Sequence, residues 1–145
     1  MRPLFLVDNS VIQRLAKPVV RQAWRGLTER GDIASCLPLL LEAGYSARSA
    51  PHHAELLELE QSAKVVLAPA PEILTIALTI QSALFAAEKG RSAGVSDIQI
   101  AATAMHYSSP DRPVVIVHYD ADFDQIASVM PQLQTKWIVP RGSAD

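Results

Sequence analysis

The pattern of apolar and polar residues divides the chain into alternating strands and helices. Residues 4–7, 33–37, 65–67 and 113–118 form short apolar or nearly apolar runs, and a further short run at 136–139 precedes a polar tail. Strands that are buried on both faces show such continuous runs instead of strict alternation. The segments at 4–7, 33–37, 113–118 and 136–139 are therefore predicted as strands of a covered sheet, whereas the run at 65–67 is noted only as a short apolar run.

Between the strands, apolar residues recur at the spacing of amphipathic helices. We expect Ser10 to cap the first helix, and Ser96 or Asp97 to cap the helix that follows residue 97. The predicted helices span residues 11–16, 19–30, 39–45, 54–63, 72–89 and 98–108, and a last helix ends near residue 130. In the helix at 72–89 the residues expected in the core are Ile73, Leu74, Ala77, Leu78, Leu84 and Phe85.

The order of these elements predicts an α/β fold, with a mostly parallel central sheet flanked by helices on both faces. The chain has 145 residues and no internal repeat or linker, so we expect one domain over residues 1–145. No apolar run reaches the ~18 residues that a membrane span needs. Asp8 interrupts the only stretch that a signal peptide could use. We therefore expect a cytoplasmic protein without membrane contact.

Charge narrows the possible partners. The formal net charge is −2, which excludes binding to duplex DNA by overall positive charge. Arg14, Lys17, Arg21 and Arg25 recur at three- and four-residue spacing and so share a possible helix surface. This surface is either a local contact for nucleic acid or an ordinary solvated helix face. The single cysteine, Cys36, is expected to be a small core residue.

Acidic residues stand at the ends of two predicted strands and near the starts of helices. Asp8 follows the strand at 4–7, and Asp120 follows the strand at 113–118. Glu42 and Asp97 lie at or near the N-terminal ends of helices. In a doubly wound sheet, ligands bind outside the carboxyl ends of the strands. All four acids are therefore predicted to converge on one edge of the sheet.

Convergence of these carboxylates would be costly without a cation. Two carboxylates ~4 Å apart repel by about 1 kcal/mol in water and by about 4 kcal/mol at an effective dielectric constant of 20. Glu42 adds to the problem, because we expect it in an almost wholly apolar helix, where an unpaired carboxylate costs several kcal/mol. Oxygen ligands alone favour Mg²⁺ or Mn²⁺ over zinc. The alternative is a non-catalytic α/β binding module whose acids only cap helices.

Four motifs together resemble the PIN-domain nucleases, and among them most closely the VapC toxins of bacterial toxin–antitoxin pairs. The first is Leu-Val-Asp-Asn-Ser at residues 6–10, and the second is Glu42 in the helix after the second strand. The third is residues 97–104, and the fourth is residues 118–123. Asn9 departs from the family, which often has Thr there, but Ser10 is kept. The resemblance extends over nearly the whole chain.

The resemblance implies a single PIN-like domain and an endoribonuclease that depends on Mg²⁺ or Mn²⁺. RNA phosphodiesters would be hydrolysed by metal-activated water, leaving a 5′-phosphate. The resemblance also implies a cognate antitoxin as partner and, together with the apolar surplus of the chain, a homodimer. Whether the fourth acid is Asp120, Asp122 or both stays open. The residues implied as catalytic are Asp8, Glu42, Asp97 and Asp120; those implied as metal ligands are Asp8, Asp97, Asp120 and Asp122, with Ser10 in support.

Overall fold

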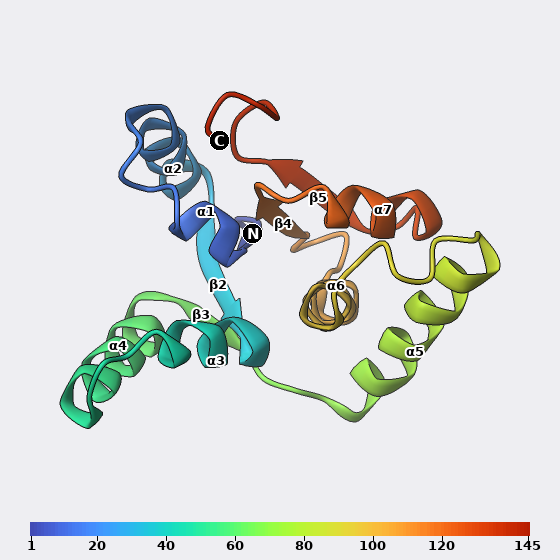
Figure 1. The fold of residues 1–145 in the computed structure, drawn as a ribbon, viewed down its shortest axis with the longest axis horizontal. Helices are drawn as coiled ribbons and strands as arrows, with labels where there is room; N and C mark the ends of the chain where they lie inside the picture. Colours follow the sequence, from blue (N-terminus) through green and yellow to red (C-terminus); the bar gives the residue numbers. More distant parts are fainter.

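A computed structural model describes all residues from 1 to 145 and contains one sheet of five strands. The strand order is β3-β2-β1-β4-β5, and every neighbouring pair is parallel (Figure 1). The predicted α/β class is confirmed, and the sheet is wholly parallel. The strands are β1 (Leu4–Val7), β2 (Asp32–Cys36), β3 (Val65–Leu67), β4 (Val114–His118) and β5 (Gln134–Trp137).

Seven helices connect and cover the strands. Four of them have a proline in the first turn, where the missing N–H leaves no backbone donor unpaired. None of the helices combines the length with the apolar character that crossing a membrane requires. The helices are α1 (Asn9–Ile12), α2 (Pro18–Arg30), α3 (Leu37–Tyr45), α4 (Ala50–Ala63), α5 (Pro71–Ala86), α6 (Val95–Tyr107) and α7 (Asp122–Val129).

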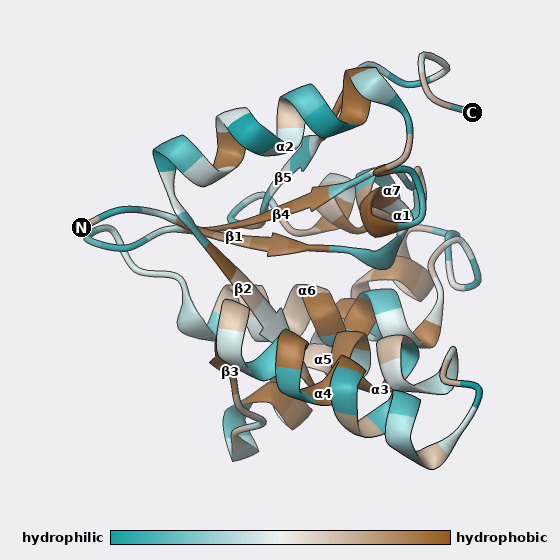
Figure 2. Cartoon of the chain, turned by 90° about the vertical axis from the view of Figure 1, so that its left-hand side faces the viewer, coloured by the Kyte–Doolittle hydropathy of each residue, from teal (hydrophilic) through white to brown (hydrophobic).

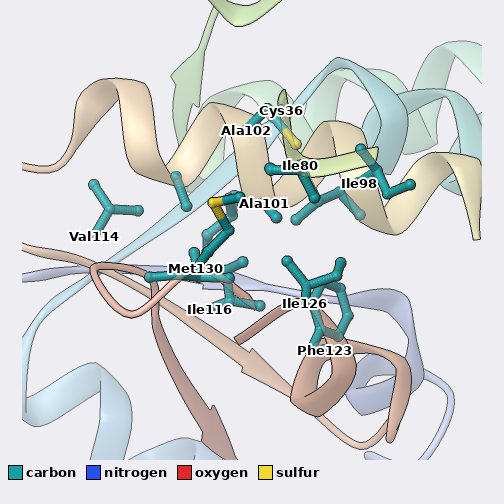
Figure 3. Packing of buried hydrophobic residues seen from close by; sticks show 14 of the residues in the cluster. Cys36, Ile80, Ile98, Ala101, Ala102, Val114, Ile116, Phe123, Ile126 and Met130 are labelled. Atoms are coloured by element: carbon teal, nitrogen blue, oxygen red, sulfur yellow. The ribbon is translucent and has the colours of Figure 1, made fainter. Parts of the chain in front are cut away.

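Helices cover both faces of the sheet. Successive residues of its central strands point to opposite faces, so each strand contributes side chains to two cores. Leu4 and Leu6 of β1 join a core built with α3, α5, α6 and α7. Phe5 and Val7 join a second core built with α1 and α2 on the other face. Figure 2 shows α2 on one side of the strands and α3 to α6 on the other. In the larger core, α6 lies close to the sheet through its small residues Ala101 and Ala102, and Figure 3 shows residues of α5, α6, α7 and β4 packed together.

Both predictions of helix caps are wrong. Asp8, not Ser10, caps α1, because its carboxylate accepts a hydrogen bond from the Ser10 backbone N–H at 3.1 Å. The helix α6 begins earlier than predicted, with Gly94 as its N-cap. Ser96 and Asp97 consequently lie inside its first turn. The sequence indicates polar residues near both helix starts, but the predicted caps lie two or three residues after the observed ones.

The prediction that the apolar residues of α5 are all core residues is wrong for three of them. Leu74, Phe85 and Leu78 are exposed by 67%, 59% and 58%, whereas Ile80 and Leu84 are fully buried. The helix α5 packs on α6 and α7, and its exposed side carries these three apolar side chains together with polar ones such as Thr75 and Gln81. We call Leu74, Leu78 and Phe85 the α5 surface. Apolar residues on both sides of the helix made the buried side hard to identify from periodicity.

Candidate metal centre

Four of the predicted acids are brought to one edge of the sheet by the parallel pairing of β1 and β4. Val7 is in register with Val117, so the two strands end side by side. Asp8 follows β1 directly, and Asp120 follows β4 by two residues. Asp122 is the first residue of α7, and Asp97 lies in the first turn of α6. The carboxyl ends of the central strands are therefore lined with carboxylates, as the sequence predicts.

Three of these acids lie close enough to share one ion. Asp97, Asp120 and Asp122 each offer a carboxylate oxygen, and these oxygens all lie within 4.8 Å of one another. All three side chains are half-buried. Asp8 is not part of this group of three, although it is buried and lies near enough for its charge to act on Asp97. The arrangement is a three-carboxylate cluster with Asp8 beside it.

Backbone N–H groups hold the cluster in place. Asp120 Oδ1 accepts from the N–H of Asp122 at 2.9 Å, and Asp122 Oδ2 accepts from the N–H of Gly94 at 3.3 Å. The second contact joins the start of α7 to the start of α6. The sequence analysis did not identify Gly94, because its part in the cluster is played by a backbone group with no sequence signature.

The cluster carries negative charge that no neighbouring cation offsets. Burial, followed by the charges of Asp8 and Asp120, raises the pKa of Asp97 to about 8. Burial also raises the pKa of Asp8, although hydrogen bonds from Ser10 oppose this shift. The ion pairs within 4.0 Å involve only Asp32 and Glu60 among the acids, so Asp8, Asp97, Asp120 and Asp122 have no Lys or Arg partner.

Glu42 lies in a different environment from the predicted one. It is exposed, and its Oε2 accepts a hydrogen bond from Asn9 Nδ2 at 2.7 Å. The expected burial among apolar residues is wrong because the apolar residues around it are themselves exposed, with Leu41 64% and Tyr45 93% exposed. Glu42 still contributes to the raised pKa of Asp8. The structure thus places it next to Asp8, outside the three-carboxylate cluster.

The third acid after β4 points elsewhere. Both carboxylate oxygens of Asp124 accept from Trp137 Nε1 at 3.2 Å, which ties this acid to β5. His118 is the last residue of β4 and is fully buried. Its Nδ1 accepts from the Asp120 N–H at 3.2 Å. Asp124 is therefore a nearby acid that lies outside the cluster, and it can serve as a control for substitutions of the cluster acids.

Binding of a divalent cation explains this set of carboxylates better than helix capping does. Capping accounts for Asp8 and for the Asp120 contact, but the N-cap of α6 is Gly94, not Asp97. A carboxylate stabilised mainly by a helix N-terminus has a lowered pKa, whereas the pKa of Asp97 is raised. An all-oxygen set of three carboxylates suits Mg²⁺ or Mn²⁺. The residues present therefore fit a hard divalent ion.

Because the pKa of Asp97 is raised, the free energy of unfolding is expected to depend on pH. In the folded state the Asp97 carboxyl keeps its proton up to a pH of about 8, whereas its ordinary pKa is 3.8. Its contribution to the free energy of unfolding is therefore fully present below pH 3.8 and is lost progressively as the pH rises through about 8. Without metal, we expect the free energy of unfolding to fall by about 1 kcal/mol between pH 7 and pH 9. His118, whose pKa is lowered, is neutral over this range. Thermal melts in EDTA measure the loss.

Asp97→Asn is the matched control for that measurement. Its melting temperature in EDTA is expected to change less between pH 7 and pH 9, because the titrating group is gone. If the wild type and this variant lose the same stability over the range, Asp97 does not titrate there.

Comparison with known proteins agrees with the fold. The PIN domain family profile matches residues 5–129. The chain is 38% identical over 141 residues to "Ribonuclease VapC51" of Mycobacterium tuberculosis (strain ATCC 25618 / H37Rv), with 97% of each chain covered. Among solved structures it resembles VapBC-1 from nontypeable Haemophilus influenzae, with a TM-score of 0.72, 17% identity, and 93% of this chain and 98% of that chain covered.

A second solved structure is VapBC-5 from Mycobacterium tuberculosis, a member of the VapBC family of toxin-antitoxin systems. It matches with a TM-score of 0.62 and 18% identity, covering 92% of this chain and 98% of that chain. At these identities the solved structures establish the fold alone. The parallel sheet with carboxylates at its carboxyl edge is consistent with the PIN domain profile, which covers most of the chain. The chain belongs to the PIN domain family and, within it, to the VapC proteins, as the sequence motifs predicted.

Proposed function

We propose that this protein is an endoribonuclease that depends on Mg²⁺ or Mn²⁺ and acts as the toxin of a toxin–antitoxin pair. The observation that carries the proposal is the three-carboxylate cluster, with oxygens within 4.8 Å and no cationic partner, at the ligand-binding edge of a PIN fold. The printed name of the M. tuberculosis relative, a ribonuclease, supports RNA as the substrate. Action on RNA as a toxin places the protein in the cytoplasm.

In this proposal, Asp8, Asp97, Asp120 and Asp122 hold the ion. A bound divalent ion supplies the charge that stabilises the reacting phosphodiester and lowers the pKa of a water molecule. Asp97 gives up its proton when the ion binds, because the cation replaces the proton as the compensating charge. Hydrogen bonds from the Ser10 side chain and backbone lower the pKa of Asp8 against the larger rise caused by burial, and so favour its ionised form.

Glu42 has a separate part in the proposal. It stands outside the cluster at an exposed position beside Asn9, where it can meet a substrate without leaving its hydrogen bond. We assign it a catalytic role together with Asp8, Asp97 and Asp120. The Asn9 amide then does what a Thr hydroxyl at this position could also do, which is to donate one hydrogen bond.

Expression in bacteria tests the proposed toxin. We expect induction to stop growth, and co-expression of the small protein encoded next to this gene to restore it. Asp124→Asn should remain toxic, because Asp124 binds Trp137 and not the cluster. Asp97→Asn should be harmless at the same protein level. Growth arrest by Asp97→Asn equal to that of the wild type would mean that toxicity does not come from this centre.

A homodimer is the expected oligomeric state, and the α5 surface is the proposed interface. Leu74, Leu78 and Phe85 are exposed, and no charged residue stands between Glu72 and Glu88. In an isologous dimer a patch meets its own copy, so a neutral apolar patch pairs without like-charge repulsion. Light scattering at micromolar concentration is expected to give twice the mass of the chain. Leu78→Glu should give a monomer.

The control for the dimer is Gln61→Glu on α4, which adds the same charge at an exposed polar position. We expect this variant to stay dimeric. A monomeric mass for the wild type, both alone and with the neighbouring gene product, would contradict the homodimer.

A further inference from the structure

The hydroxyl group of Tyr119 organises the C-terminal segment, residues 142–145. It donates a hydrogen bond to Asp145 Oδ1 at 2.7 Å. It also accepts from the N–H groups of Gly142 at 2.8 Å and Ala144 at 3.0 Å. Tyr119 and Ala144 are both buried. One hydroxyl group therefore satisfies three polar groups of this segment, and two of them are backbone donors.

The backbone of the same residue reaches the acidic edge. The Tyr119 N–H donates to Ser10 Oγ at 2.9 Å, and the Ser10 N–H donates to Asp8 Oδ2 at 3.1 Å. Tyr119 also directly precedes Asp120 in the chain. The segment 142–145 is thus linked through Tyr119 to two of the four acids at the edge.

Arg14 closes this set of contacts into a ring. Its guanidinium lies over the Tyr119 ring, 4.5 Å from the centroid. Arg14 Nε donates to the Ala144 carbonyl at 3.0 Å, and Arg14 Nη1 donates to the Ser10 carbonyl at 2.9 Å. Lys17 Nζ donates to the Asp145 carbonyl at 2.7 Å. The two cations therefore bind the C-terminal segment.

These contacts correct the sequence-based picture of the basic residues. Arg14 and Lys17 lie between α1 and α2, so they do not share a helix surface with Arg21 and Arg25. A solvated helix face does not describe them. Pro18 starts α2 after these two residues, and this leaves their side chains free to reach residues 144 and 145.

We infer that Tyr119 and Arg14 are positioning residues that, with the C-terminal segment as a clamp, hold Asp120 in the three-carboxylate cluster and Asp8 beside it, ready for a metal ion. The inference rests on the proposed metal-dependent function. Carboxylates of like charge move apart unless their backbones are held, and a site that is already assembled loses less free energy on binding an ion. The contacts of Tyr119 and Arg14 restrain both backbones. They restrain Asp8 through Ser10, and they restrain Asp120 through Tyr119 at the end of β4.

Tyr119→Phe tests the inference, because it removes the hydroxyl group and keeps the ring under Arg14. We expect its Kd for Mn²⁺, measured by the electron paramagnetic resonance of free Mn²⁺, to rise about tenfold, as is usual for residues that orient metal ligands. Tyr107→Phe is the control. The Tyr107 hydroxyl donates to the Ala68 carbonyl at 2.6 Å, at the far end of α6, so its loss should leave the Kd unchanged.

A second readout follows the clamp itself. The bond after Arg141 is a trypsin site, and we expect faster cleavage there in Tyr119→Phe than in the wild type or in Tyr107→Phe. Faster cleavage with an unchanged Kd for Mn²⁺ would mean that the segment is only a structural cover, and would overturn the inference. No change in either measurement would overturn it too.

The outcomes also separate this inference from the proposed function. A wild-type protein that binds no Mn²⁺ would remove the proposed function and the inference together. Wild-type binding with an equal Kd in Tyr119→Phe would remove the inference alone. If Tyr119→Phe does not fold, Arg14→Lys takes its place, because Lys keeps the charge but cannot donate to both the Ser10 and Ala144 carbonyls in the same fork. We expect a similar rise in Kd.

Discussion

Asp97→Asn is expected to fold normally and to cleave RNA at least about 100-fold more slowly than the wild type. A loss of this size is typical when a contact that stabilises transition-state charge is removed. The substitution preserves volume but removes one of the three carboxylates whose oxygens lie within 4.8 Å. It also removes the carboxylate whose pKa is raised to about 8 by burial and by neighbouring acids, a strain that a bound cation would relieve. Cleavage rates with Mn²⁺ and circular dichroism melts measure the two effects.

Asp8→Asn is expected to behave in the same way, because Asp8 is buried beside the cluster. The matched control is Asp124→Asn. Asp124 lies two residues after Asp122, but its carboxylate binds Trp137, so we expect cleavage within about twofold of the wild type. Full activity of Asp97→Asn or Asp8→Asn with metal present would remove that residue from the centre.

Asp120→Asn is expected to be at least as stable as the wild type in EDTA and to gain less stability from Mn²⁺. Without metal, the substitution removes one of several crowded charges, and Asn keeps the Oδ1 that accepts the Asp122 N–H. With metal, an ion present at about 100 times its Kd stabilises the fold by about 2.7 kcal/mol, and loss of a ligand lowers this gain. Melting temperatures in EDTA and in Mn²⁺ give both quantities.

The same melts of Asp122→Asn decide which acid is the fourth ligand. A role limited to helix capping predicts no Mn²⁺ response in any of the proteins. Equal metal shifts in Asp120→Asn and the wild type, with a smaller shift in Asp122→Asn, would remove Asp120 from the centre and leave Asp122 as the fourth acid. Smaller shifts in both variants would place both acids on the ion.

Four of the five strands and the acidic edge were predictable because their signals are local, whereas β3, an apolar run of three residues, was not predicted as a strand. The run at 4–7 is apolar because both of its faces are covered, and an acid directly after it must lie at the sheet edge. Asp8 and Asp120 meet because β1 and β4 are parallel neighbours, which the alternation of strands and helices indicates. The sequence left the choice between Asp120 and Asp122 open, and the structure brings both into one cluster with Asp97.

What could not be predicted depends on contacts between distant residues. The exposure of Glu42 follows from the placement of α3 at the surface, which an apolar composition conceals. Both sides of α5 carry large apolar residues, so the residue type alone does not mark Leu78 as exposed. Tyr119 meets Ser10 across 109 residues and Asp145 across 26, and neither contact leaves a periodic trace. Tertiary packing, not local propensity, decides these positions.

The ends of the cleaved RNA test the central claim most directly. Purified protein is incubated with RNA in Mn²⁺ or in EDTA, and the new 5′ ends are sequenced after capture that requires a 5′-phosphate, with a parallel sample in which 5′-hydroxyl ends are first phosphorylated. Hydrolysis at a metal centre predicts new 5′-phosphate ends in Mn²⁺, none in EDTA, and none with Asp97→Asn. Ends that carry a 5′-hydroxyl and form equally well in EDTA would show attack by the ribose 2′-hydroxyl without metal, and would contradict the account.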